Sequence, residues 1–202
     1  MNITSHTGGV VQTNGFIVES DSGTVVIDAP GGIAAFLRTR KLTPDALLLT
    51  HQHFDHVEDA AALADMGATI FAHSAFSHDL ILDEVARRWG LPVEIPPFTV
   101  DTRLAGEESV EAGGVRFAIS HVPGHSPDSI CFHLPEAGTL FGGDTLFAGS
   151  IGRTDFPGGD HPLLLAGIRA KLFTLPDPTA VHPGHGPSTT IGRERASNPF
   201  LA

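Results

Sequence analysis

The sequence predicts an α+β fold in which two β-rich halves pack face to face with helices outside. Three observations predict it. Short apolar, β-branched runs recur in both halves, helix-forming stretches separate these runs, and histidines follow the ends of several runs. The chain has 202 residues, of which 41% are hydrophobic. Because this is enough to build one core, we expect a single domain over residues 1–202.

The first elements lie near the N-terminus. Residues 9–19 and 24–28 are rich in β-branched residues and flank a polar turn at 20–23, which predicts two strands. Helix formers over 33–41 predict a helix. The uninterrupted apolar run at 46–49 predicts a short strand that is buried on both faces.

Three further elements are expected before the middle of the chain. Residues 57–66 are rich in alanine and leucine and end at Gly67, which predicts a helix. Residues 69–72 are expected to form a strand and residues 75–89 a helix. The stretch 90–106 holds three prolines and no clear period, so we interpret it as a loop or lid.

The second half repeats the strand pattern with one helix. Apolar runs predict strands at 115–120, 129–134, 139–142 and 179–182. A helix is expected over 161–173, with Asp160 as its N-cap because a carboxylate there can accept from the first backbone N–H groups.

Composition and charge exclude several function classes. The formal net charge of −11 disfavours a nucleic-acid partner. No apolar run approaches the ~20 residues that a membrane helix needs, and the first residues lack the pattern of a secretory leader. The only cysteine, Cys131, allows no internal disulfide. We therefore expect a cytoplasmic protein with no membrane partner, and formation of a homo-oligomer stays open.

Histidine is the anomaly of the composition, with twelve residues against no tyrosine. Residues 50–56 read Thr-His-Gln-His-Phe-Asp-His directly after a predicted strand. His51 and His53 are two apart, so both rings would project to the same side of extended backbone. Asp55 and His56 follow a bend and face a different point. Because four such ligands crowd a single ion, the spacing favours two neighbouring metal ions.

Further ligands must come from distant segments. His125 and His185 each follow an apolar strand and a Pro-Gly bend. Asp144 ends the apolar run 140–143 in the same way. A carboxylate has two oxygens and can bridge two ions, whereas a neutral imidazole cannot. The candidate metal ligands are therefore His51, His53, Asp55, His56, His125, Asp144 and His185.

These motifs resemble those of the metallo-β-lactamase superfamily. The signature H-x-H-x-D-H is matched by His51, His53, Asp55 and His56, followed in chain order by His125, Asp144 and His185. Within that superfamily, residues 147–160 and 183–200 are similar to short glyoxalase II-like hydrolases. The resemblance implies a four-layer αββα sandwich with a dinuclear site. It implies His51, His53 and His125 on one ion, Asp55, His56 and His185 on the other, and Asp144 as the bridge.

The resemblance also implies a chemistry. Two divalent ions are expected, Zn²⁺ foremost and iron as the alternative. Bound metal lowers the pKa of water from ~15.7 to ~7, so hydroxide is available to attack a carbonyl carbon at neutral pH. The implied substrate is a small-molecule thioester of the hydroxyacylglutathione type, or a related ester or lactone. Asp55 is the expected catalytic residue, because it can orient the hydroxide and carry a proton to the leaving group.

Two residues outside the ligand set are also singled out. Arg153, in the Gly-Arg-Thr-Asp segment at 152–155, is expected to clamp a substrate carboxylate, and the competing interpretation is an internal ion pair with Asp155. Asp28, at the end of a strand, is interpreted as a carboxylate that orients a ligand without binding the ion. The chain ends shortly after His185, so we expect no C-terminal helical domain for glutathione binding.

Other functions stay open at the level of sequence. The segment around Arg153 also resembles persulfide dioxygenases of the same superfamily, which are implied to bind one iron through the equivalents of His51, His125 and Asp144. From a different class, the chain could be a non-catalytic or redox-partner metal-binding module. The complete set of candidate ligands favours an enzyme over that module.

Overall fold

The computed structural model describes residues 1–201, which form two compact units. The first unit comprises Met1–Ala105 and Glu111–Val115. The second comprises Gly106–Val110 and the chain from Arg116 onward. Each unit holds most of one six-stranded sheet and its own helices, which confirms the α+β class. The single domain over 1–202 stays a prediction.

The sheet of the first unit has its strands in chain order. These are β1 (Asn2–Gly8), β2 (Thr13–Ser20), β3 (Gly23–Ile27), β4 (Ala46–Leu48), β5 (Thr69–Ala72) and β6 (Thr102–Arg103). The pairs β1–β2 and β2–β3 are antiparallel, and the later pairs are parallel. The short helices are α1 (Ile33–Arg40), η1 (Phe54–His56), α2 (Ala60–Asp65), α3 (His78–Ile81) and α4 (Asp83–Arg88).

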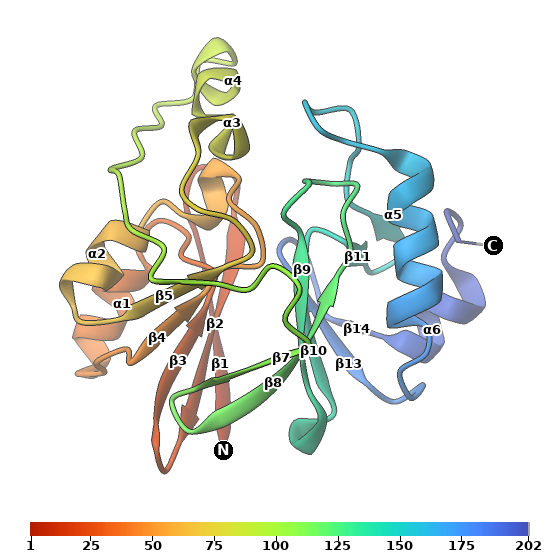
Figure 1. Cartoon of the computed structure of the whole chain (residues 1–202), viewed down its shortest axis with the longest axis horizontal. Coiled ribbons are helices and arrows are strands. Elements are labelled where there is room, and N and C mark those ends of the chain that lie inside the picture. The colour runs from red at the N-terminus through yellow and green to blue at the C-terminus, as the bar shows by residue number, and fades with distance from the viewer. Residues whose placement is uncertain (202) are drawn as a thin grey trace. The chain divides into compact units, whose positions relative to one another are not determined.

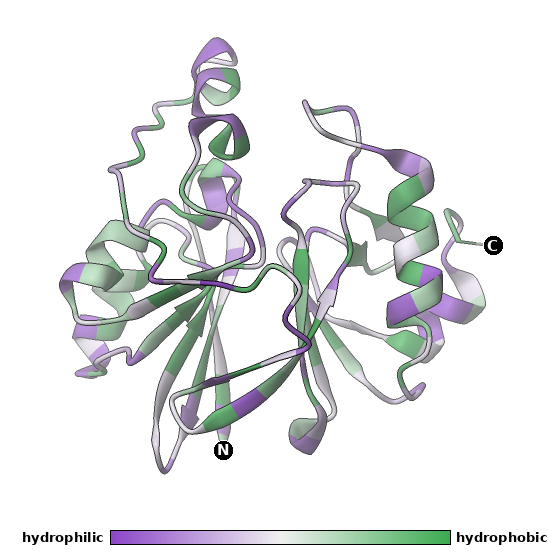
Figure 2. Cartoon of the chain, in the orientation of Figure 1, coloured by the Kyte–Doolittle hydropathy of each residue, from purple (hydrophilic) through white to green (hydrophobic). Residues whose placement is uncertain are grey.

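The core of the first unit lies between its sheet and α1 and α2 (Figure 1). Ile17, Val26 and Leu47 from the strands pack in one buried cluster with Leu37 of α1 and Leu63 of α2. Hydrophobic residues predominate in β3 and β4 (Figure 2). β4 is buried along its whole length, and the histidine-rich loop at 50–56 follows almost directly after it.

The second unit has a sheet in the order β14-β13-β10-β9-β8-β7. Its strands are β7 (Ser109–Ala112), β8 (Val115–His121), β9 (Ile130–Leu134), β10 (Thr139–Gly143), β13 (Ala180–Pro183) and β14 (Thr189–Thr190). β10 and β13 run parallel, while β8–β9, β9–β10 and β13–β14 are antiparallel. A small separate hairpin pairs β11 (Leu146–Phe147) with β12 (Ser150–Ile151).

The helices of the second unit are η2 (Pro135–Ala137), α5 (His161–Gly167), its wider continuation η3 (Ile168–Leu172) and α6 (Ile191–Ser197). Hydrophobic and hydrophilic residues are both present along α5 (Figure 2). Leu164 and Ile168 bury their side chains against Leu140 of β10 and Val181 of β13. This cluster fixes the strands whose ends carry Asp144 and His185.

Many predicted elements are confirmed, including both central strands of each sheet, α1 and α5. The Asp160 side chain caps α5 as predicted, accepting from the N–H of Leu163 at 2.9 Å. The single helix at 75–89 was wrong, because Leu82 adopts a left-handed φ of 58° and divides it into α3 and α4. The helix expected at 57–66 begins only at Ala60.

The stretch 90–106 is irregular as predicted, but it is not a detached lid. Val93, Ile95 and Phe98 are each less than 10% exposed and pack into the core of the first unit. Its end also forms the edge strand β6 beside β5. Elements that the sequence did not predict are β1, β6, β7, β11, β12, β14, α6 and the short helices η1 and η2. Among the described residues, no helix is long and apolar enough to cross a bilayer.

Candidate metal ligands in the two units

In the first unit, the four candidate ligands of the 50–56 loop are buried and close together. The ring centroids of His51 and His53 lie 4.6 Å apart, and those of His51 and His56 lie 4.1 Å apart. Asp55 Oδ2 lies 3.4 Å from His56 Nε2. The turn of η1, in which the N–H of His56 donates to the carbonyl of His53 at 2.9 Å, brings Asp55 and His56 back beside His51.

Asp28 fixes which ring nitrogens of this loop carry hydrogen. His56 Nδ1 donates to Asp28 Oδ2 at 2.9 Å. The hydroxyl of Thr50 donates to the same oxygen at 2.8 Å, so its own oxygen accepts from His51 Nδ1 at 3.1 Å. The N–H of Thr50 donates to Asp28 Oδ1 at 2.8 Å. In both histidines Nε2 is therefore the nitrogen with a lone pair, as a metal ligand requires.

The position of Asp28 carries backbone strain. Its φ is 59°, in the left-handed region that non-glycine residues rarely adopt. Two backbone hydrogen bonds hold the chain there. The N–H of Asp28 donates to the carbonyl of Leu48 at 3.0 Å, and the N–H of Ala29 donates to the backbone carbonyl of His56 at 2.8 Å. The carboxylate is thereby pointed at the histidine loop, and its role in orienting a metal ligand stays a prediction.

Gln52 anchors the same loop from its other side. Its side-chain nitrogen donates to the carbonyls of Ser74 and Ala75, both at 3.0 Å, and the residue is fully buried between the two histidines that flank it in sequence. Because these carbonyls follow β5, Gln52 attaches the histidine loop to the neighbouring strand.

In the second unit, His125, Asp144 and His185 converge. Asp144 Oδ2 lies 3.6 Å from His125 Nε2 and 3.5 Å from His185 Nε2. His125 Nδ1 donates to the carbonyl of Arg153 at 2.7 Å, which again leaves Nε2 as the nitrogen with a lone pair. The N–H of Gly184 donates to the carbonyl of Gly143 at 2.8 Å, so the loops of Asp144 and His185 are joined by backbone.

Two glycines let the backbones around these ligands approach each other. A Cβ at Gly152 would lie 1.8 Å from the carbonyl oxygen of Asp144 and 3.1 Å from Cβ of His125. Gly124, with φ 132°, would place a Cβ 2.6 Å from the carbonyl oxygen of Asp160. A side chain at Gly152 would therefore displace the candidate ligands Asp144 and His125, and one at Gly124 would clash with the start of α5.

The spacing of the donor atoms within each unit fits shared metal ions. N···O distances of 3.4–3.6 Å exceed the ~2.9 Å of an N–H···O hydrogen bond. Two ligands that sit ~2.1 Å from one tetrahedral zinc ion lie roughly 3.4 Å apart. The donor set of imidazole nitrogens and carboxylate oxygens suits Zn²⁺ and also iron. The donors of each unit therefore fit a divalent ion in chemistry and in spacing.

Arg153 is engaged within the protein. Its Nε and Nη2 donate to the two oxygens of Asp155, both at 2.7 Å, and its guanidinium carbon lies 4.1 Å from the centre of the Phe156 ring. The Arg153 hydrogen bond holds the pKa of Asp155 at about 2. This geometry matches the competing interpretation of an internal pair, and the substrate clamp stays a prediction.

Other histidines make contacts with the protein. His121 Nε2 donates to the carbonyl of Pro127 at 2.9 Å. His182 Nδ1 lies 2.7 Å from the hydroxyl oxygen of Ser188, across the loop that carries His185, and burial lowers the pKa of His182. Both therefore support the backbone beside a candidate ligand.

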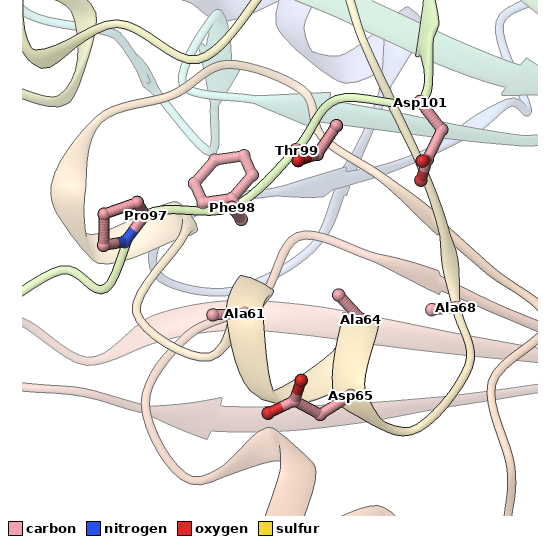
Figure 3. A pocket seen from close by; sticks show the side chains of 8 residues that line it. All are labelled: Ala61, Ala64, Asp65, Ala68, Pro97, Phe98, Thr99 and Asp101. Carbon is pink, nitrogen blue, oxygen red and sulfur yellow. The ribbon is translucent and has the colours of Figure 1, made fainter.

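Each unit has a cavity of its own. One of about 380 Å³ lies in the first unit between α2 and the 97–101 segment, with Phe98 facing Ala61 and Ala64 (Figure 3). None of the seven candidate ligands lines it. Another of about 370 Å³, in the second unit, is lined by Arg153, Asp155, His161 and Phe200. This second cavity adjoins the loop whose carbonyl holds His125.

Sequence reasoning missed the residues that hold the ligands in place. Thr50 and Gln52 lie inside the motif, yet neither was singled out. The hydroxyl of Thr13 donates to Asp55 Oδ2 at 2.6 Å. The two residues are 42 positions apart, so no local sequence pattern predicts this contact.

Comparisons with known proteins agree with the resemblance. The family model described as the metallo-beta-lactamase superfamily matches residues 8–185. Hydroxyacylglutathione hydrolase GloC of Haemophilus influenzae is 42% identical over 198 residues, covering 94% of this chain and 93% of that protein.

Two solved structures are similar over nearly the whole chain. The BLEG-1 B3 metallo-beta-lactamase is 38% identical with a TM-score of 0.90, covering 99% of each chain. TTHA1623 in a di-iron-bound form is 42% identical with a TM-score of 0.84, covering 98% of this chain and all of that one. The fold expected from the motifs is confirmed.

Proposed function

Because the chain belongs to the metallo-β-lactamase superfamily and is a metallo-hydrolase of that family, we propose that it hydrolyses a small-molecule thioester of the hydroxyacylglutathione type. The substrate class is supported by the 42% identity to GloC over 94% of the chain. A related ester or lactone would undergo the same attack on its carbonyl carbon.

One observation carries the metal-dependent part of the proposal. In each unit an imidazole Nε2 lies 3.4–3.6 Å from a carboxylate oxygen, as two ligands of one ion do. We propose that His51, His53 and His125 hold one ion, that Asp55, His56 and His185 hold the other, and that Asp144 bridges them. The orienting role of Asp28 is supported by its bonds to His56 and Thr50.

The chemistry divides between the ions and the protein. When bound, two divalent ions would bring the pKa of water near 7 and polarise the substrate carbonyl. In this proposal Asp55 orients the attacking hydroxide and carries a proton to the leaving group. A thiol has a pKa of about 8.5, so the departing thiolate needs little help from a proton, which suits a thioester. We expect the reaction to occur in the cytoplasm, without nucleic acid or membrane as partner.

The test joins metal content to activity in one preparation. The full chain would be purified without added metal, and its zinc and iron would be measured by mass spectrometry. Hydrolysis of S-lactoylglutathione would then be followed by loss of the thioester absorbance. We expect about two metal ions per chain and thioester hydrolysis, and we expect Asp144→Ala to lower the rate more than about 100-fold, because losing a bridging ligand disrupts both ions.

The matched control is His121→Gln. This histidine precedes a candidate ligand and donates to Pro127, and glutamine keeps a donor. The control should retain activity within about threefold. A rate for Asp144→Ala equal to that of the control would overturn the metal-dependent mechanism.

Two specific observations favour alternative reactions. The di-iron form of TTHA1623 favours iron as the alternative metal. Because the alternative reaction uses iron, the preparation is also tested for sulfite formation from glutathione persulfide. One iron per chain with sulfite formation would replace the hydrolase by a dioxygenase. The similarity to BLEG-1 favours a β-lactam amide as a second candidate substrate, and hydrolysis of a chromogenic cephalosporin tests it.

A further inference from the structure

A buried threonine holds the proposed catalytic carboxylate. Thr13 is the first residue of β2 and is 0% exposed. Its hydroxyl donates to Asp55 Oδ2 at 2.6 Å, and that same oxygen lies 3.4 Å from His56 Nε2. Thr13 therefore contacts the same oxygen of Asp55 that lies near the neighbouring candidate ligand His56.

The hairpin that carries Thr13 is itself held in place. Gln12 precedes it with a left-handed φ of 60°, which turns the chain into β2. The N–H of Gly9 donates to the carbonyl of Gly31 at 3.0 Å. The carboxylate of Glu58 accepts backbone hydrogen bonds from Gly31 and Val10, and burial raises the pKa of Glu58. The tip of the hairpin is thus joined to the loop after Asp28 and to the chain after His56.

This arrangement limits how the Asp55 carboxylate can turn. A carboxylate oxygen has two lone pairs. The Thr13 hydrogen occupies one of them at short range, so the remaining lone pair of Oδ2 keeps a defined direction. Hydrogen bonds to a ligating carboxylate fix its orientation, and losing such a partner typically weakens metal binding by about 10- to 100-fold.

We infer that Thr13 is a positioning residue that orients Asp55 to bind a metal ion. The inference rests on the proposed role of Asp55 as a ligand. It is independent of the substrate, because metal binding can be measured when no thioester is present.

The experiment is calorimetry of the metal-free full chain with Zn²⁺. Asp55→Asn first identifies the binding step that depends on Asp55. Thr13→Val has the shape of threonine without its hydroxyl, and it should weaken that step by about 10- to 100-fold while leaving any other step within about threefold. Thr13→Ser keeps the hydroxyl and should restore the affinity.

Thr7→Val is the matched control, because the Thr7 hydroxyl makes a comparable bond in the same hairpin, to Asn14 Oδ1 at 2.7 Å, without touching Asp55. It should leave zinc affinity unchanged. If Thr7→Val and Thr13→Val weakened zinc binding equally, Thr13 would act only by stabilising the hairpin, and the inference would be overturned. So would an unchanged Asp55-dependent step in Thr13→Val, or the absence of any such step. Two zinc ions without thioester hydrolysis would refute only the proposed substrate.

Discussion

At the scale of single residues, Arg153 and Asp155 form a bidentate ion pair on an exposed loop. The pair is backed by Phe156, and the carbonyl of Arg153 holds His125. An exposed pair contributes little to stability when it stands alone. Here the pair acts on the position of His125, because it holds the turn whose Arg153 carbonyl accepts the hydrogen bond from His125.

The pair predicts a pH dependence. Its hydrogen bond lowers the pKa of Asp155 from the ordinary 3.8 to about 2. The stabilisation is therefore fully present above about pH 4 and is lost as the pH falls through about 2, because the unfolded chain binds the proton first. Arg153→Gln should return the pKa of Asp155 toward 3.8, measured by carboxyl NMR. Arg88→Gln, which removes another exposed arginine, should leave it at about 2.

The residue types of the site could be predicted from sequence, but their orientation could not. The spacing of His51, His53, Asp55 and His56 already indicates ligands. The ring nitrogen that carries hydrogen is set in His56 by Asp28 and in His125 by the carbonyl of Arg153, each 28 residues away in sequence. Such contacts depend on the folded backbone, and no local pattern specifies them.

At the scale of elements, α6 supports the β11–β12 hairpin through one buried carboxylate. Glu194 is 1% exposed. Its oxygens accept from the hydroxyl of Thr189 at 2.5 Å, and from the N–H of Gly149 and the amide of Asn198 at 2.8 Å each. Both carboxylate oxygens thus accept hydrogen bonds, and the hairpin between Asp144 and Arg153 is attached to α6.

Glu194→Gln should destabilise the protein by about 1–3 kcal/mol, because a glutamine amide cannot accept all three hydrogen bonds and leaves a buried donor unmatched. Urea unfolding measures the change. Glu136→Gln, on an exposed turn, makes the same chemical change and should stay within about 0.5 kcal/mol of the parent. Equal stability of the two variants would contradict the role given to Glu194.

Elements with apolar repeats were predictable, and those held by tertiary contacts were not. No residue of β1 is fully buried, so its sequence needs no apolar run that would have predicted a strand. α6 begins at a threonine cap in a segment without hydrophobic periodicity. The break at Leu82 opposes the helix propensity of its neighbours. Buried Asp83, which binds Arg87 at 3.1 Å, begins the second helix there.

At the scale of the whole molecule, the proposed ligands are divided between the two units. His51, His53, Asp55 and His56 belong to the first unit, and His125, Asp144 and His185 to the second. Neither unit by itself carries all seven. The division follows from the repeated arrangement of strand and loop, which the sequence predicts for both halves, whereas the order of strands in each sheet required the structure.

Metal should therefore stabilise the folded chain. Free Zn²⁺ at about 100 times its dissociation constant adds roughly 2.7 kcal/mol. For a chain of this length that corresponds to a rise in Tm of roughly 5–10 °C. Differential scanning calorimetry of the metal-free chain with added Zn²⁺ measures it. Mg²⁺ prefers oxygen ligands and should cause a much smaller shift. An unchanged Tm with Zn²⁺ would contradict metal binding by the native chain.

The left-handed torsion at Asp28 has a consequence for protein engineering. Glycine would adopt that φ without strain, but it would leave the buried donors of Thr50 and His56 without their acceptor. The replacement would remove the acceptor that sets the protonation of two imidazoles. An engineer who relaxes the backbone at this position should therefore expect to lose the hydrogen bonds and the ring orientation together.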